Sequence, residues 1–420
     1  VFQPQVKNAE QDPEELMKEK NLVKDAAEFI LIHQIPTFIR DCLDHSTSPV
    51  DGKSLTKALH HNGINIRYLG FVTEVVAKYP KLSYLHSICI CELVTRAAKY
   101  HYKTCVQGAE LMKLSCAISH FLNCLLSSCP NPHTQVNKDE LHSQKSKKRN
   151  KKKSRNIVTV ASDNLEWAHE TPKSLWKKIV TSVKEYYGFT LECDSTHGLV
   201  ERYTVQKISL FRAFCKTNGI QMLLKDYTMD SKTRQPFFED DVVNVFPSVK
   251  NIHPKASDAY HVFTSGQAKI QQGLLREGYE LISEALNLLN NVYGAMHPEI
   301  AACARLLARL NYIMGDYGEA LVYQQRAVLM SERVLGIDDP NTITEYSHMA
   351  LYSFANQQIP TALKLMYRAR YLALLCHGES HPDVALFDSN VGLILQAVGE
   401  FDLSLRFLMK ALELNTQFFG

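Results

Sequence analysis

The sequence lacks any long apolar run. No stretch reaches the 18 or more consecutive apolar residues of a membrane-spanning helix, so membrane insertion is not expected. The residues after Val1 also lack the basic segment and short apolar core of a secretory signal. We therefore expect a cytoplasmic protein.

Cysteine is present but lacks the spacing of a metal site or a disulfide framework. The 11 cysteines are an odd number at irregular intervals, and none forms a Cys-x-x-Cys pair or a Cys/His quartet. Such thiols are interpreted as small buried side chains in a reducing compartment. No metal and no cofactor is expected.

Motifs for nucleotide binding and catalysis are also missing. Gly52-Lys53-Ser54 matches the end of a phosphate-binding loop, but that loop needs a glycine at position 47, where this chain has Thr47. No Ser/His/Asp set or pair of carboxylates stands out, and His60-His61 is interpreted as a surface pair. An enzyme is not expected, and no residue is assigned a catalytic role.

The net charge of +3 conceals an uneven distribution. Residues 256–420 contain 11 Lys/Arg and 17 Asp/Glu, which leaves the rest of the chain at +9. Eight of the basic residues lie between Lys145 and Arg155. An acidic last part is a poor surface for RNA and a good one for proteins.

A 42-residue period governs the last part of the chain. It is marked by Gly294, Gly336, Gly378 and Gly420, and by Pro298, Pro340 and Pro382. Each glycine follows an amphipathic stretch and is expected to end a helix in the left-handed conformation. Each proline suits the first turn of the next helix, because that turn has no use for the missing N–H. Helices in pairs are therefore predicted, with the tight turn inside a pair at Gly315 and Gly399.

Small residues recur with the same period at Ala327, Ala369 and Ala411, where neighbouring helices can approach closely. A single pair of helices cannot bury its apolar side, so successive pairs are expected to stack. The pattern resembles the tetratricopeptide repeats of kinesin light chains. We predict a mainly α-helical protein whose residues 256–420 form an α-solenoid of four units, 258–294, 298–336, 340–378 and 382–420.

Alignment of the units predicts a peptide groove on the first helix of each pair. Its candidate residues are Arg305, Arg309, Tyr312, Phe354, Ser389, Asn390 and Gln396. In a binding role, Asn390 would bond a peptide backbone and the arginines would meet acidic side chains. The alternative is that these polar residues are solvated or bond within the solenoid.

The first part of the chain is predicted to be a helical domain over residues 1–129 and a small α-rich domain or linker over 166–255. Residues 14–44 favour an amphipathic helix interrupted at Pro36, and Ser54 is expected to cap the next helix. Thr171 is expected to cap a helix with Pro172 at its first position.

Residues 130–165 have no apolar periodicity and are predicted to be a disordered basic insertion. Its candidate RNA contacts are Lys147, Lys148, Arg149, Lys151, Lys152, Lys153 and Arg155. Such a cluster can neutralise phosphates with a steep dependence on salt. A nuclear address and a merely solvated loop remain alternatives.

Several strings closely resemble the clustered-mitochondria family. They are IPTFIRD (35–41), DGKSLTKALHHNGINIRYLG (51–70), QKISLFR (206–212) and FPSVKNIHPKASDAYHVFTSGQAKIQQG (246–273), followed by the 42-residue repeats. The resemblance covers nearly the whole chain except the basic insertion. It offers no catalytic residues to carry over.

This resemblance implies a cytoplasmic protein that binds messenger RNAs for mitochondrial proteins, associates with translation machinery including initiation factor 3, and keeps mitochondria dispersed. Two hypotheses follow from it. In the first, the chain is an RNA-associated regulator. In the second, it is a protein-interaction scaffold whose groove holds a peptide of a ribosomal, motor or mitochondrial-surface partner, without direct contact to RNA.

Overall fold

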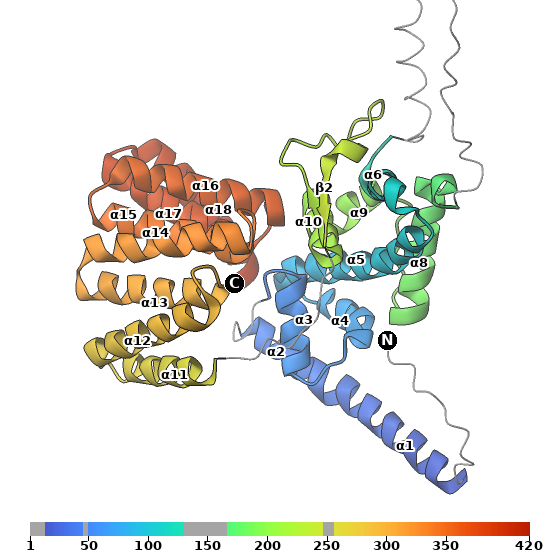
Figure 1. Cartoon of the computed structure of the whole chain (residues 1–420), viewed down its shortest axis with the longest axis horizontal. Coiled ribbons are helices and arrows are strands. Elements are labelled where there is room, and N and C mark those ends of the chain that lie inside the picture. The colour runs from blue at the N-terminus through green and yellow to red at the C-terminus, as the bar shows by residue number, and fades with distance from the viewer. Residues whose placement is uncertain (1–12, 45–48, 130–165, 247–255) are drawn as a thin grey trace, which may run out of the picture.

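The computed structural model describes residues 13–44, 49–129, 166–246 and 256–420 and shows a helical protein with two lobes (Figure 1). The predicted mainly α-helical class is confirmed. We call the described residues up to 246 the central lobe and residues 256–420 the repeat lobe. Within these ranges no helix combines the length and the apolar character needed to cross a membrane.

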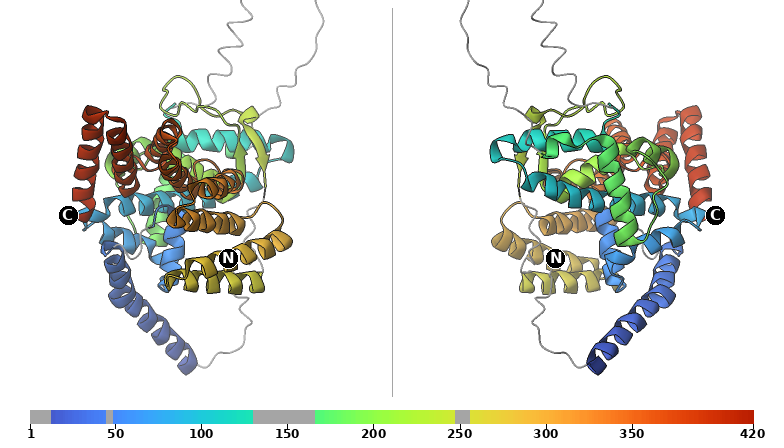
Figure 2. Two further views of the ribbon diagram at one scale, coloured as in Figure 1. Left: turned by 90° about the vertical axis from the view of Figure 1, so that its left-hand side faces the viewer. Right: turned by 90° about the vertical axis from the view of Figure 1, so that its right-hand side faces the viewer.

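The central lobe begins with a projecting helix. Its first helices are α1 (Pro13–Phe29), α2 (Ile35–Leu43), α3 (Gly52–His61), α4 (Leu69–Val76), α5 (Ser83–Gln107) and α6 (Leu114–Leu126). Helix α1 leaves the body of the protein in every view (Figures 1 and 2). A π-helix at Ile30–Gln34 separates α1 from α2, just before Pro36. The predicted interruption at this proline is thereby confirmed, because proline lacks the N–H of a continuous helix.

Two helix starts test the expected caps. Helix α3 is capped by Asp51, whose side chain accepts from the N–H of Ser54, so the expectation that Ser54 is the cap was wrong by three residues. Ser54 lies at the third helical position, and its hydroxyl oxygen accepts a hydrogen bond from the N–H of Asp51. Thr171 caps α8 (Pro172–Tyr187) as predicted.

The remainder of the central lobe completes the same core. It consists of α8, α9 (Thr196–Tyr203), α10 (Lys207–Asn218) and an antiparallel strand pair, β1 (Ile220–Met222) and β2 (Val242–Val245). Phe214 of α10 stacks on Phe121 of α6, and Tyr102 of α5 packs edge-on against both rings. The predicted division between 1–129 and 166–255 therefore runs through one shared core. Aromatic residues distant in sequence meet there, which no local pattern shows.

The repeat lobe is the predicted stack of helix pairs. The pairs are α11 (Ser257–Gln271) with α12 (Leu275–Tyr293), α13 (Pro298–Met314) with α14 (Tyr317–Val334), α15 (Pro340–Ala355) with α16 (Ile359–His377), and α17 (Pro382–Val398) with α18 (Phe401–Phe419). The four predicted units thus coincide with four helix pairs in residues 256–420. Each periodic proline lies in the first turn of a first helix, as expected.

The periodic glycines have the positive φ that favours glycine, but not all are left-handed. Gly315 and Gly399, inside the pairs, have φ of 89° with ψ near zero, the left-handed conformation. Gly294 and Gly378, between pairs, combine positive φ with an extended ψ of −166° and −175°. The left-handed prediction was therefore wrong at these two positions, since the chain must there lead into a new helix.

Helices pack closely where the small residues recur. Ala320, Ala327, Ala362 and Ala369 are completely buried, and Ala411 is nearly so. Because packed interiors leave no room for added atoms, these positions set how closely the helices approach.

Candidate functional site

The predicted groove residues all lie on first helices of the repeat lobe: three on α13, Phe354 on α15 and three on α17. The side chain of Arg305 is engaged in a contact within the solenoid. Its Nη1 donates to Oε1 of Glu345 at 2.8 Å, and Gln324 donates to the other carboxylate oxygen at 2.6 Å. The Glu345 side chain is 1% exposed. Arg305 therefore joins two repeats, the alternative left open for these polar residues.

The charge of Glu345 depends on this contact. Burial raises the pKa of Glu345 above its ordinary value, and the nearby positive charge of Arg305 opposes that rise. A buried carboxylate without its partner would be costly. The residues near Arg305 are therefore better candidates for contacts with a peptide in the groove than Arg305 itself.

Arg309 and Tyr312 lie in an aromatic wall between α13 and α15. The Tyr312 ring stacks on Tyr352 with centroids 4.7 Å apart. Arg309 is exposed and forms no ion pair with any described residue. Burial lowers the pKa of His348, with smaller contributions from Arg305 and Arg309, so this ring is neutral beside the arginine. The wall can hold an acidic or aromatic side chain.

The other candidates lie farther along the solenoid. Phe354 is half-buried and packs against the core. Ser389 and Asn390 are half-buried and Gln396 is exposed, all on α17. The structure thus brings Arg309 and Tyr312 together and places the α17 residues two units away.

Sequence reasoning missed His348, Tyr352 and Glu345. The contacts Arg305–Glu345 and Tyr312–Tyr352 both join residues 40 positions apart, whereas the repeat period is 42. Alignment by the period finds equivalent residues, while contacting residues lie two positions short of it. A search for complementary pairs at that offset would have found both contacts.

The junction between the lobes is a second candidate site. Arg212 of α10 donates to Asp338 at 2.7 Å and to Asp339 at 3.2 Å, and Lys216 contacts Asp339 at 2.6 Å. Burial would raise the pKa of Asp339, but the hydrogen bond and charge of Lys216, with Arg212, hold it below its ordinary value. The carboxylate therefore stays ionised.

Successive repeat boundaries lie along this junction. The hydroxyl of Ser209 donates to the carbonyl of Cys376, and Tyr84 packs edge-on against His381. At the end of the solenoid, Lys81 donates to the carbonyl of Phe419 at 3.3 Å. Because the boundaries recur with the repeat, one face of the central lobe contacts several of them.

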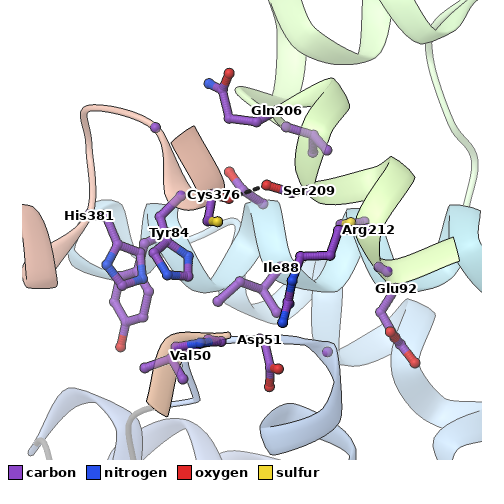
Figure 3. A pocket seen from close by; sticks show the side chains of 18 of the residues that line it. Val50, Asp51, Tyr84, Ile88, Glu92, Gln206, Ser209, Arg212, Cys376 and His381 are labelled. Atoms are coloured by element: carbon purple, nitrogen blue, oxygen red, sulfur yellow. Dashed lines mark hydrogen bonds between the residues drawn. The ribbon is translucent and has the colours of Figure 1, made fainter. Parts of the chain in front are cut away.

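A cavity of about 770 Å³ lies in the junction. Figure 3 shows Arg212 and Glu92 toward one end, His381 and Tyr84 toward the other, and Asp51 below. His381 accepts the N–H of Asp383 on Nδ1, and its buried Nε2 has no hydrogen-bond partner among the described residues.

Burial shifts the pKa of several cavity residues. Burial lowers the pKa of both His377 and His381 to about 4, and it raises the pKa of Cys91 and Cys376 to about 12. The described residues contain no cluster of three or more His, Cys, Asp or Glu arranged to hold a metal ion. Near neutral pH these imidazoles are therefore uncharged and these thiols protonated.

The candidate RNA contacts from Lys147 to Arg155 lie outside the described residues. Their role stays a prediction.

Comparisons with known proteins follow this division of the chain. The family described as "Translation initiation factor eIF3 subunit 135" matches residues 46–229, and the tetratricopeptide repeat family matches residues 257–333. The clustered mitochondria protein homolog of Xenopus tropicalis is 55% identical over 423 residues, covering 100% of this chain and 32% of that protein. Protein clueless of Drosophila persimilis is 50% identical over 447 residues, with 100% and 31% covered.

The chain thus spans about a third of the length of these relatives. Among solved structures, kinesin light chain repeats from Podosopora anserina share 19% identity with a TM-score of 0.36, covering 40% of this chain and 79% of that one.

Proposed function

Because this chain belongs to the clustered-mitochondria family, we propose that it is part of a cytoplasmic, non-catalytic scaffold that binds messenger RNAs for nuclear-encoded mitochondrial proteins. Through these RNAs it regulates the expression of mitochondrial proteins and the distribution of mitochondria. The observation that carries the proposal is the 55% identity over the entire chain to a clustered mitochondria protein homolog. The match of residues 46–229 to an initiation-factor family supports association with translation machinery.

The two-lobed structure supports a role in binding. A shared core and the Arg212–Asp339 contacts hold the repeat lobe against the central lobe. Surfaces on both lobes therefore keep a defined spacing, as a scaffold for more than one partner requires.

The RNA partner is tested by ultraviolet crosslinking of this chain in cells, followed by sequencing of the bound RNA. We expect enrichment of messenger RNAs for mitochondrial proteins over the RNAs recovered with an unrelated helical-repeat protein of similar charge. Recovery no higher than with that control would refute the proposal.

The basic insertion is tested separately. Replacing the eight basic residues between Lys145 and Arg155 by glutamine should flatten the salt dependence of RNA binding, because each phosphate contact to a single strand contributes a slope of about −0.7. An unchanged slope would show that the insertion makes no phosphate contact.

A second candidate function is the capture of a peptide in the groove of the repeat lobe. The wall of Arg309, Tyr312 and Tyr352 favours it, because an exposed arginine beside stacked rings suits an acidic peptide with an aromatic or apolar anchor. Ribosomal, motor and mitochondrial-surface proteins are the candidate sources of the peptide.

Arg309→Glu tests the groove without disturbing Arg305. It should abolish recovery of the peptide partner and leave RNA retention unchanged. Arg276→Glu, on an exposed residue of α12, is the matched control. Equal loss of partner proteins from both variants would contradict a role for this groove.

A further inference from the structure

The second helices of the last three units, α14, α16 and α18, share a basic outer face. Two series of positions, each spaced by one 42-residue period, carry most of its charge. The first series is Val322, Lys364 and Arg406, and the second is Arg326, Arg368 and Lys410. Arg333 lies two turns after Arg326 on α14. These six cations are more than half of the 11 Lys/Arg in residues 256–420. We call them the basic band: Arg326, Arg333, Lys364, Arg368, Arg406 and Lys410.

Helical geometry turns this band toward solvent. At about 100° per residue, Val322, Arg326, Leu329 and Arg333 point roughly opposite to the buried face of α14. That buried face contains Ala320, Gln324, Ala327 and Ser331. Five of the six cations are exposed and Lys410 is half-buried.

Within the described residues, the cations of the band are engaged only weakly. None of the six forms an ion pair with a described residue, whereas Lys269, Arg305 and Arg370 pair with Glu277, Glu345 and Asp388. Arg368 lies over the Tyr346 ring, 4.7 Å from its centroid, and Arg326 donates weakly to Asn290 at 3.4 Å. Lys364 and Arg406 make neither kind of contact with a described residue. The positive charge of the band is therefore available to a ligand.

Contacts between units hold together the helices that carry the band. Arg370 of α16 lies over the ring of Phe407 on α18, at 5.1 Å. Tyr346 bonds Glu332 of α14 and contacts Arg368 of α16, so it links those two helices. The band ends at α12, which has Glu280 and Glu284 at the positions equivalent to Val322 and Arg326.

A hollow of about 430 Å³ opens within the band. Met296, Leu329 and Met330 line it between the guanidinium groups of Arg326 and Arg333. On the next helix the side chain of Tyr371 is 63% exposed. Apolar and aromatic surfaces between cations are what single-stranded nucleic acids need, because unstacked bases cover such surfaces while phosphates meet the charges.

We infer that the basic band is a binding surface for single-stranded RNA, separate from the groove and from the basic insertion. The inference rests on the proposed function for the choice of RNA as partner. Acidic protein segments also carry negative charge, but the hollow and Tyr371 suit a flat base stacked beside an arginine. Three exposed carboxylates, Glu319, Asp402 and Glu413, lie within one or two turns of the band on α14 and α18. The six cations exceed these three anions, and the field of the other acidic residues is screened by salt.

Neutralising Lys364 and Arg406 tests the band without unfolding it. The double substitution Lys364→Gln and Arg406→Gln removes two exposed cations that hold no other residue. Each phosphate contact strengthens single-strand binding about fivefold at about 0.1 M salt, so the loss should be about 25-fold, and the salt slope should fall by about 1.4. Lys57→Gln with Lys103→Gln is the matched control, since it removes the same charge from exposed residues of the central lobe.

Binding is measured by fluorescence anisotropy of a labelled oligouridine of about 20 nucleotides over a series of salt concentrations. The full chain is used with the native insertion and with its eight basic residues replaced by glutamine. Wild-type affinity of the band variant in both backgrounds would overturn the inference and leave the proposed RNA binding intact. If the unmodified chain bound no RNA, the proposed function would fail as well.

In a final competition experiment, unlabelled polyglutamate is added to the complex of the chain with labelled oligouridine. We expect it to compete poorly with oligouridine. Equal competition that disappears in the band variant would overturn the assignment to RNA in favour of an acidic protein partner.

Discussion

Removing the guanidinium of Arg305 should destabilise the repeat lobe at neutral pH. Arg305→Ala leaves the 1%-exposed carboxylate of Glu345 with only Gln324 as donor. Loss of one partner from a buried ion pair costs about 3–5 kcal/mol. Arg305 itself is 36% exposed, and the hydrogen bond of Gln324 persists. We therefore expect a smaller loss than this range, about 2–3 kcal/mol, after allowing for solvent screening.

The pH dependence of this loss separates charge from packing. The pKa of Glu345 is already above its ordinary value, and removal of Arg305 raises it further. A carboxyl with a raised pKa in the folded state binds its proton more tightly when folded. Its stabilising contribution is therefore present at low pH and lost as pH rises through the folded-state pKa. The destabilisation by Arg305→Ala should accordingly shrink between about pH 7 and pH 5.

Hydrogen exchange of α13 and α15 is the suitable assay, because two lobes need not unfold in one step. The variant is compared with wild type at each pH, which removes the intrinsic pH dependence of exchange. Arg309→Ala, an exposed arginine one turn away without an ion pair, should change protection by less than about 0.5 kcal/mol. Unchanged protection in Arg305→Ala at neutral pH, or a loss that grows on acidification, would refute the reasoning.

Three further outcomes are expected. Asp339→Asn retains a helix cap for Asn341 but weakens the contacts with Arg212 and Lys216, so it should lower the opening free energy of α10 and α16, measured by hydrogen exchange, by about 1–3 kcal/mol. Asp338→Asn, at a half-exposed residue, should lower it by less. The reverse order would contradict the role of Asp339 in holding α10 against the repeat lobe. His377 and His381 have a folded-state pKa of about 4, below the ordinary 6.5, so their stabilising contribution is complete above pH 6.5 and is lost as pH falls toward 4. Proteolysis of the junction should accelerate over that pH range. A proteolysis rate that does not change with pH would be inconsistent with the burial of the two rings. Ala327→Leu should lower the free energy of unfolding by about 1–3 kcal/mol, measured by thermal denaturation, because the larger side chain overpacks the helix contact. Leu329→Ala, on the outer face, should leave it nearly unchanged. Equal effects of the two substitutions would show that Ala327 does not lie in the helix contact.

The repeat lobe was predictable because its signals are local and periodic. Gly315 and Pro298 mark helix ends by their own backbone preferences, and the 42-residue period shows that the same decision recurs. The cap at Thr171 was found for the same reason, while Asp51 was missed because Ser54 lies nearby and can serve the same purpose.

The candidate sites were less predictable. Arg305 and Arg309 occupy equivalent-looking positions on one helix, yet one holds a buried carboxylate and the other is free of ion pairs. The junction joins Arg212 to Asp339 across 127 residues, and no spacing within either segment points to the other. The net charge of the repeat lobe also pointed away from the basic band, since a sum over residues contains no information about faces.

By itself, the sequence determined where helices begin and end in the repeat lobe and that they must stack in pairs, because caps, glycine φ and apolar periodicity act over a few residues. Tertiary structure decided which charged side chains form ion pairs within the protein and which face solvent. The physical reason is desolvation: Glu345 requires Arg305 only because neighbouring repeats bury it, whereas Lys364 and Arg406 are exposed and pair with no described residue.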